Sequence, residues 1–114
     1  MSQTVRHYTK TDLPLRPAVP GAAMWAVGLD QAMLTYFEIE PHSRFEKHHH
    51  ESEQITLVLE GTLYFEVNDQ IVAVATGETI TLPSNTPHAA YTLETAVKAV
   101  DAWSPVRKEY LANP

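Results

Sequence analysis

HHHESEQITLVLEG at residues 48–61 and GETITLPSNTPH at residues 77–88 are the stretches that decide the fold. Each holds a short run rich in apolar and β-branched residues beside glycine or proline, which is typical of a strand between tight turns. The same pattern continues in both directions along the chain, where further turn signals separate further short runs. It predicts nine strands, over residues 22–29, 32–40, 44–48, 55–59, 62–67, 71–75, 79–82, 88–92 and 97–103. Short, evenly spaced strands without a helical period indicate an all-β sandwich or barrel, the pattern expected of jelly rolls and related small barrels.

The two ends of the chain differ from this central part. Three prolines lie in residues 1–21, for which we expect an extended arm rather than a helix. Residues 22–114 then form a single barrel domain, because the length of 114 residues fits one domain of the usual ~100–200 residues. A short helical turn is expected over residues 107–111. The apolar residues of 13–20 have little barrel left to cover, so we expect the arm to pack on a second copy in a homodimer.

Composition narrows the class of partner. Eight Lys and Arg residues stand against fourteen Asp and Glu residues, which gives a formal net charge of −6. With no basic run, this negative field disfavours nucleic acid and anionic membranes as partners. Cysteine is absent, which excludes disulfides and thiolate metal sites and fits a reducing compartment. No segment approaches the ~20 apolar residues of a membrane span, and the first ten residues lack the apolar core of a signal peptide. We therefore expect a cytoplasmic protein that acts on a small molecule.

Four of the six histidines fall within residues 42–50. A strand points alternate side chains to opposite faces, so His48 and His50 share a face, and Gln54 returns to it if the strand continues. Imidazole is the commonest protein ligand for first-row divalent metals, and His88 opens a later strand from which it could complete the site. The spacing thus predicts a metal site, while a solvated polar edge is the alternative for the histidine run alone.

The two stretches resemble the paired motifs of the cupin superfamily. The first motif, His-x-His with a later glutamate and glycine, corresponds to His48, His50, Gln54 and Gly61; the second, Gly, Pro-x-Gly and His, corresponds to Gly77, Pro83, Asn85 and His88. The resemblance implies a double-stranded β-helix barrel that holds one divalent transition metal through His48, His50, Gln54 and His88. Manganese, iron, nickel, copper and zinc all accept such ligands.

Three positions depart from the cupin pattern. His42 and Asn85 stand where the family has glycine, and we expect a positive φ at both, which asparagine tolerates well and histidine at some cost. A metal contact from His42 is an alternative use of that residue. Gln54 replaces the usual glutamate, so the predicted ligand set is neutral and a bound dication keeps its full charge, which favours Lewis-acid chemistry over dioxygenase chemistry.

The C-terminal segment DAWSPVR at residues 101–107 carries a second group of chemical residues. Strand alternation places Asp101 and Trp103 on one face, with Arg107 just beyond, so an acid, an aromatic ring and a cation can face one cavity. The alternative is a closing strand in which Trp103 fills the barrel mouth and Asp101 pairs with Arg107. The three tyrosines of the strands either line the cavity or pack, and packing is the ordinary role of strand aromatics: Tyr36, Tyr64 and Tyr91.

This segment, together with residues 48–61, resembles small single-domain cupins of pectin and alginate breakdown, which linearise 4,5-unsaturated uronates into open-chain keto acids. That family has phenylalanine where this chain has Trp103. The resemblance implies an enzyme with Asp101 as catalytic acid and base, Arg107 on the sugar carboxylate, and Trp103 as an aromatic site residue. A non-catalytic cupin that binds a small anion through its metal, a different cupin enzyme such as a dioxygenase, and a purely structural barrel remain as alternatives.

Overall fold

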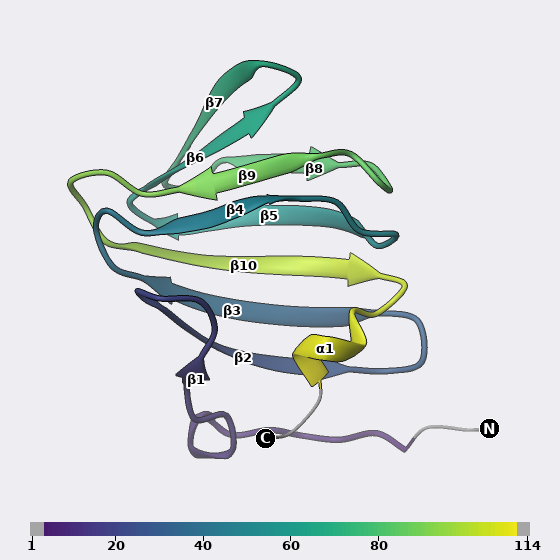
Figure 1. Cartoon of the computed structure of the whole chain (residues 1–114). Helices are drawn as coiled ribbons and strands as arrows, with labels where there is room; N and C mark the ends of the chain where they lie inside the picture. Colours follow the sequence, from purple (N-terminus) through teal and green to yellow (C-terminus); the bar gives the residue numbers. More distant parts are fainter. Residues whose placement is uncertain (1–3, 112–114) are drawn as a thin grey trace.

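The computed structural model describes residues 4–111, which form two antiparallel sheets that enclose one core (Figure 1). The six-stranded sheet has the order β1-β2-β3-β10-β5-β8 and contains Arg16–Pro17 (β1), Ala22–Gly28 (β2), Met33–Ile39 (β3), Val97–Ser104 (β10), Glu53–Glu60 (β5) and Thr79–Leu82 (β8). The four-stranded sheet has the order β4-β9-β6-β7 and contains Arg44–His48 (β4), His88–Tyr91 (β9), Thr62–Val67 (β6) and Gln70–Ala75 (β7). The predicted all-β jelly roll is confirmed, and all nine predicted strands are present.

The hydrophobic core lies between the two sheets. Its most deeply buried side chains come from both of them: Met24 and Val58 from the six-stranded sheet, and Phe65 from the four-stranded sheet. Full burial of one such side chain stabilises a fold by about 1.5–3 kcal/mol. The strands therefore keep the alternation of buried and exposed positions that their sequence indicates, as in β10, where every second residue is buried.

Strand register aligns side chains in rows across the six-stranded sheet. One inward row contains Thr35, Asp101 and Thr56, which are direct partners on β3, β10 and β5. The next inward row contains Met33, Trp103 and Gln54 on the same strands. Neighbouring inward rows from three strands thus place polar side chains beside the apolar core. This arrangement prepares one end of the barrel for chemistry.

Tight turns connect the strands, and several need a left-handed backbone. His42 has a φ of 56° and Asn85 a φ of 59°, which confirms the expectation from their glycine-like motif positions. Gly61 has a φ of 88°, and a Cβ atom there would lie 2.4 Å from the carbonyl oxygen of Ala96. Glycine is therefore required at this turn both by backbone conformation and by close approach.

The arm is not extended throughout, because a 3-10 helix spans Lys10–Asp12. This turn forms because Thr9 and Asp12 make a capping box across it. Further on, β1 pairs with β2 of the same chain, so the arm covers an edge of its own six-stranded sheet. The sheet edge that the arm covers therefore belongs to its own chain, whereas the sequence predicted contact with a second copy.

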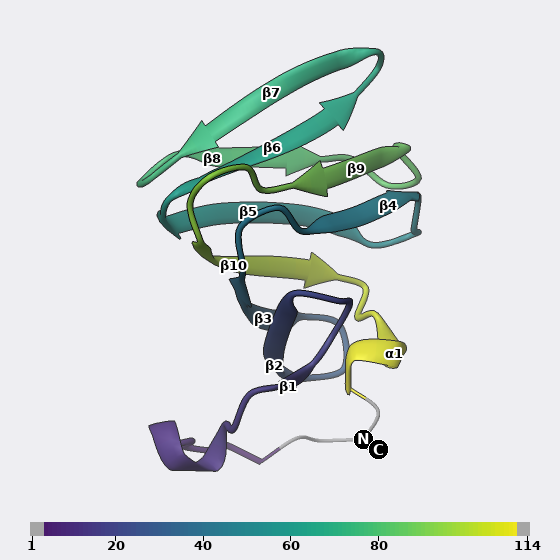
Figure 2. The same cartoon turned by 60° about the vertical axis from the view of Figure 1, so that its left-hand side comes forward.

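A short helix, Lys108–Leu111 (α1), closes the described part of the chain, as expected. Figure 2 shows it beside β2 and β3, near one end of the barrel. Leu111 packs against Gly28, where a Cβ atom would lie 2.8 Å from a Leu111 methyl group. The Arg16 guanidinium donates to the Tyr110 carbonyl oxygen, so the arm also holds this helix. Within residues 4–111, no helix has the length and apolar character needed to cross a membrane.

Candidate functional site

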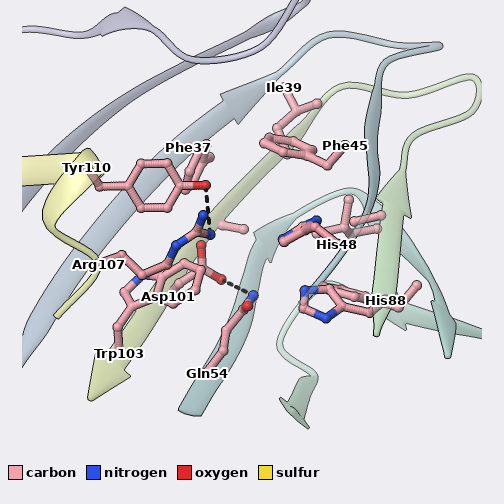
Figure 3. Close-up of a pocket in the computed structure, with 14 residues that line it drawn as sticks. Phe37, Ile39, Phe45, His48, Gln54, His88, Asp101, Trp103, Arg107 and Tyr110 are labelled. Atoms are coloured by element: carbon pink, nitrogen blue, oxygen red, sulfur yellow. Dashed lines mark hydrogen bonds between the residues drawn. The ribbon is translucent and has the colours of Figure 1, made fainter. Parts of the chain in front are cut away.

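A pocket opens at the end of the barrel where β4, β9, β5 and β10 meet α1 (Figure 3). It measures about 440 Å³, including its opening to solvent. Its polar wall is formed by His48, Gln54, His88, Asp101 and Arg107. The remaining wall is mainly apolar and aromatic, with Phe37, Phe45, Trp103 and Tyr110 among its residues. Six of the seven residues that the cupin resemblance implied as metal ligands or catalytic groups thus line one cavity, and His50, the seventh, adjoins it.

Three histidines converge at this site. His48 ends β4 and His88 begins β9, and the two are direct partners across these strands, with ring centroids 4.5 Å apart. His50 follows in the connection to β5, with its ring 5.0 Å from that of His88. One ring nitrogen from each of the three residues lies within 4.8 Å of the others. This is the spacing of nitrogen atoms that can share one metal ion.

Each of the three rings has its Nδ1 atom fixed by a backbone carbonyl two residues away. His48 binds the carbonyl of Glu46 at 2.7 Å, His50 that of Ser52 at 2.9 Å, and His88 that of Thr86 at 2.8 Å. A carbonyl only accepts, so Nδ1 carries the proton and Nε2 is left as the free donor for a metal.

Burial favours the neutral form of two of these rings, His50 and His88. It lowers the pKa of His88 to about 4 and also lowers the pKa of His50. A metal ion competes with protons for the imidazole nitrogen, so a lowered pKa leaves the ring ready to coordinate near neutral pH.

Gln54 brings its side chain to the same place from β5. Its Nε2 atom donates to Thr56 Oγ1 at 2.9 Å, which directs Oε1 to the other side of the amide. Among the described residues, Gln54 Oε1 and His50 Nε2 are both buried without a hydrogen-bond partner. Buried polar atoms without a partner are costly unless a ligand or water satisfies them. The donor set of three Nε2 atoms and one amide oxygen therefore fits a divalent transition metal.

The route by which the chain brings these residues together differs from the sequence argument. Gln54 was expected on the face of His48 and His50 only if one strand continued past the histidines, but β4 ends at His48 and β5 begins at Glu53 in the other sheet. The connection between the sheets, rather than alternation along one strand, turns His50 inward. His42 does not belong to the histidine group; it is exposed and lies 3.8 Å from the Glu94 carboxylate. The alternative of His42 as a further metal ligand is therefore wrong for this fold.

Asp101 faces the pocket from β10 and is only 5% exposed. Thr35 Oγ1 donates to its Oδ2 atom at 3.2 Å, and Thr56 Oγ1 donates to its Oδ1 atom. Gln54 Nε2 lies 3.4 Å from the same Oδ1 atom. Burial raises the pKa of Asp101 to about 6, while these hydrogen bonds and the charge of Arg107 act in the opposite direction. The carboxyl group is thus held where its proton can be exchanged near neutral pH.

Arg107 forms another side of the pocket, between two aromatic rings. Its Cζ atom lies 4.4 Å from the centroid of the Tyr110 ring and 5.2 Å from that of Trp103. Its guanidinium donates to Glu109 at 2.8 Å and to the Tyr110 hydroxyl at 3.2 Å. The sequence alternative of an Asp101–Arg107 ion pair is not what forms, because the carboxylate paired with Arg107 is Glu109, 62% exposed. A substrate carboxylate can compete for this cation.

Sequence reasoning missed three residues of the site. Thr35 and Thr56 look like ordinary strand threonines, and only the register of β3, β10 and β5 places both against Asp101. Both threonines occupy inward-facing positions of their strands, and strand alternation was the sequence signal that could have found them. Tyr110 was missed because the return of α1 over the barrel is a tertiary contact, with the Tyr110 ring 5.6 Å from that of Trp103. The three strand tyrosines lie outside the pocket lining, and two of them stack on each other: Tyr64 and Tyr91.

Comparison with known families agrees with this fold and this site. The family described as Cupin domain matches residues 35–103, which is more than half of the chain. The chain belongs to the cupin family. The predicted membership is thereby confirmed, and the histidines at 48, 50 and 88 occupy the motif positions that carried the prediction.

Solved structures share the cupin fold over nearly the whole chain. KdgF from Halomonas sp. has a TM-score of 0.85 and 22% identity, over 93% of this chain and 98% of that one. An RmlC-like cupin from Shewanella frigidimarina NCIMB 400 has a TM-score of 0.85 and 20% identity, over 96% and 99%. The polyketide cyclase RemF from Streptomyces resistomycificus has a TM-score of 0.77 and 24% identity, over 91% and 82%. No curated protein matches the sequence.

The cupin barrel thus places two kinds of group on opposite sides of one pocket. His48 and His88 lie on one side, with His50 beside them, and a buried carboxyl group and a guanidinium lie on the other. A small molecule seated between them would meet imidazole nitrogens, a carboxyl group and a guanidinium. These are the parts that general acid–base chemistry on a carboxylated molecule requires.

Proposed function

We propose that this cupin is a metal-dependent enzyme that acts on a small carboxylated sugar, and that it linearises a 4,5-unsaturated uronate. The observation that carries the proposal is the placement of Asp101 and Arg107 in the pocket beside the three histidines. A cupin that only bound an anion through its metal would not need a buried carboxyl group facing the bound molecule. The inward orientation of Asp101 therefore favours catalysis over simple binding.

His48, His50, His88 and Gln54 would hold one divalent ion. The set is neutral, and manganese, iron, nickel and zinc all fit nitrogen and amide oxygen ligands. Such an ion, when bound, supplies Lewis-acid polarisation of a substrate oxygen. The three backbone carbonyls on Nδ1 keep the rings oriented toward that position before any ion arrives.

Asp101 and Arg107 would supply the remaining chemistry. Opening the ring of the uronate removes a proton from the anomeric hydroxyl, breaks the ring carbon–oxygen bond, and adds a proton to a carbon of the former double bond. The net change is an isomerisation without an oxidant or co-reactant. Asp101 can take the first proton and give it back to carbon, while Arg107 holds the substrate carboxylate and Trp103 forms an aromatic wall.

A substrate with a larger apolar body is the second candidate. The inner wall of the pocket contains Phe37, Ile39, Phe45, Leu63 and Phe65, which offer few hydrogen bonds to a sugar. The polyketide cyclase RemF has the same fold, which supports testing a second class of substrate. The two candidate substrates differ in the part of the molecule that lies away from the carboxylate held by Arg107. Activity measured on a panel of sugar acids and aromatic acids separates them.

We also propose a homodimer in the cytoplasm, with its interface on the outer face of the six-stranded sheet. Two outward rows cross this face: Trp25, Tyr36, Val100 and Leu57, and beside them Val27, Leu34, Ala102 and Ile55. Leu34 is 39% exposed and Ile55 50% exposed. A continuous apolar face of this kind on a small domain is typical of an interface between subunits.

Two measurements test the proposed activity. The first is the metal content of untagged protein, with His88→Ala as the comparison; we expect about one ion per chain in the wild type and a large loss in the variant. The second follows the ultraviolet absorbance of a 4,5-unsaturated uronate, which disappears on ring opening, against its spontaneous decay. A wild-type rate equal to the spontaneous rate with each of the four metals would reject this substrate.

A further inference from the structure

Thr56 occupies a special place between the two halves of the site. Its side chain is 1% exposed, and its hydroxyl lies between the Gln54 amide and the Asp101 carboxylate. Gln54 Nε2 bears only hydrogens, so Thr56 Oγ1 must accept from it. The single hydroxyl hydrogen of Thr56 is then free to point to Asp101 Oδ1, which accepts it. One hydroxyl therefore joins the amide to the carboxylate with a fixed direction.

This direction settles which way the Gln54 amide faces. Asp101 Oδ1 lies 3.4 Å from Gln54 Nε2. If the amide were reversed, Gln54 Oε1 would face this carboxylate oxygen, and two acceptors repel each other. With Nε2 held on the side of Thr56 and Asp101, Oε1 projects to the opposite side of the amide. That oxygen is buried without a partner, as is His50 Nε2.

We propose that Thr56 is a positioning residue that presents the amide oxygen of Gln54 as the fourth metal ligand and couples this ligand to Asp101. The inference rests on the proposed metal site and adds a residue that the cupin motifs do not contain. It also gives a reason for glutamine at position 54: the amide alone has both a donor for Thr56 and Asp101 and an oxygen for the metal. A carboxylate at this position would place two acceptors against each other.

Thr35 provides a matched control on the other side of Asp101. It lies across from Asp101 on β3, as Thr56 does on β5, and it is equally buried. Its hydroxyl accepts from Trp103 Nε1 at 2.8 Å and donates to Asp101 Oδ2 at 3.2 Å. Neither of these hydrogen bonds of Thr35 involves Gln54. Loss of either hydroxyl removes one hydrogen bond to Asp101, but only the loss at Thr56 also removes a hydrogen bond from the Gln54 amide and leaves it the longer contact with Asp101.

The experiment compares Thr56→Val, Thr56→Ser and Thr35→Val in the full chain. Cobalt(II) is titrated into metal-free protein, with affinity measured by calorimetry and coordination followed by the visible absorption of the ion. Valine keeps the shape and β-branching of threonine without its hydroxyl, and serine keeps the hydroxyl. If Thr56→Val fails to fold, as judged by circular dichroism, Thr56→Ala takes its place.

We expect Thr56→Val to weaken cobalt binding by about 10–100-fold, the usual effect of removing a residue that orients a metal ligand. Its cobalt spectrum should change, because one oxygen ligand is no longer held in place. Thr56→Ser and Thr35→Val should keep the wild-type spectrum and an affinity within about threefold of wild type. Equal affinities and spectra for Thr56→Val and Thr35→Val would overturn the inference. Absence of cobalt binding by the wild type would instead reject the proposed metal site itself.

Discussion

Replacing Asp101 by asparagine tests the acid–base role with little change in shape. Asparagine keeps an oxygen that can accept from Thr56 and Gln54, as the Asp101 Oδ1 atom does. Its amide nitrogen would face Thr35 Oγ1, which accepts one hydrogen bond from Trp103 and retains a second lone pair. The variant should therefore fold and keep its metal ligands in place while losing the group that carries the proton.

The expected loss follows from the role of the carboxyl group. General acid–base catalysis typically contributes about 10²–10⁴-fold, so kcat of Asp101→Asn should fall by that factor. At ~1.36 kcal/mol for each tenfold change, this corresponds to about 2.7–5.4 kcal/mol of transition-state stabilisation. KM should change little, because Arg107 and the metal-binding residues are unaltered.

The assay follows the loss of uronate absorbance, and cobalt affinity is measured on the same preparation. Asp69→Asn is the matched control: Asp69 is an exposed hairpin residue with a φ of 62°, a conformation that asparagine also accepts. Full activity in Asp101→Asn would refute the acid–base role and leave Asp101 as a structural residue. Loss of cobalt binding in parallel with activity would show that the carboxylate serves the metal site rather than the proton.

A second prediction for Asp101→Asn concerns how the stability of the metal-free protein changes with pH. The pKa of His88 is lowered to about 4 from 6.5, so only the unfolded chain gains its proton as the pH falls through this range, and stability falls with it. The pKa of Asp101 is raised to about 6 from 3.8, so its contribution declines as the pH rises between these values. The two effects oppose each other. Asp101→Asn removes one of them, and its melting temperature should increase more steeply from pH 4 to 6.5 than that of the wild type.

Three further predictions concern the cation, a turn and the outer face. Glu109→Gln releases the guanidinium of Arg107 from its exposed ion pair, worth about 0.2–1 kcal/mol, so KM for a carboxylated substrate should fall by up to about fivefold at unchanged kcat. Gly61→Ala should destabilise the fold by more than Gly77→Ala, as measured by urea unfolding, because both have a positive φ but only Gly61 lacks room for a Cβ atom. A positive φ alone costs a residue such as alanine about 1–3 kcal/mol. Equal losses of stability in the two variants would show that the contact with the Ala96 carbonyl oxygen is relieved at no cost. Ile55→Glu should convert a dimer to a monomer in sedimentation equilibrium, and a wild type that is monomeric at micromolar concentration would exclude the interface.

The sequence allowed the barrel and the convergence of three histidines to be predicted because each rests on local patterns and motif spacing. The left-handed turn at Asn85 follows from its motif position, and the shared face of Asp101 and Trp103 follows from strand alternation. What could not be predicted depends on contacts between distant segments. The contact of the Tyr110 ring with Phe37 of β3, whose ring centroids lie 5.9 Å apart, requires α1 to fold back over the barrel. The contact of Thr56 with Asp101 requires the register between β5 and β10, which no spacing in the sequence specifies.

The same registers show why the site lies between the sheets. His48 and His88 belong to the four-stranded sheet, whereas Gln54 and Asp101 belong to the six-stranded sheet. An ion held by ligands from both sheets would link them at the end of the barrel, so metal binding should stabilise the fold as well as prepare the pocket. Gln54 as a ligand would extend this link to Asp101, both directly and by way of Thr56. If the proposed roles hold, a change at the metal would reach the carboxyl group through these hydrogen bonds rather than through the substrate.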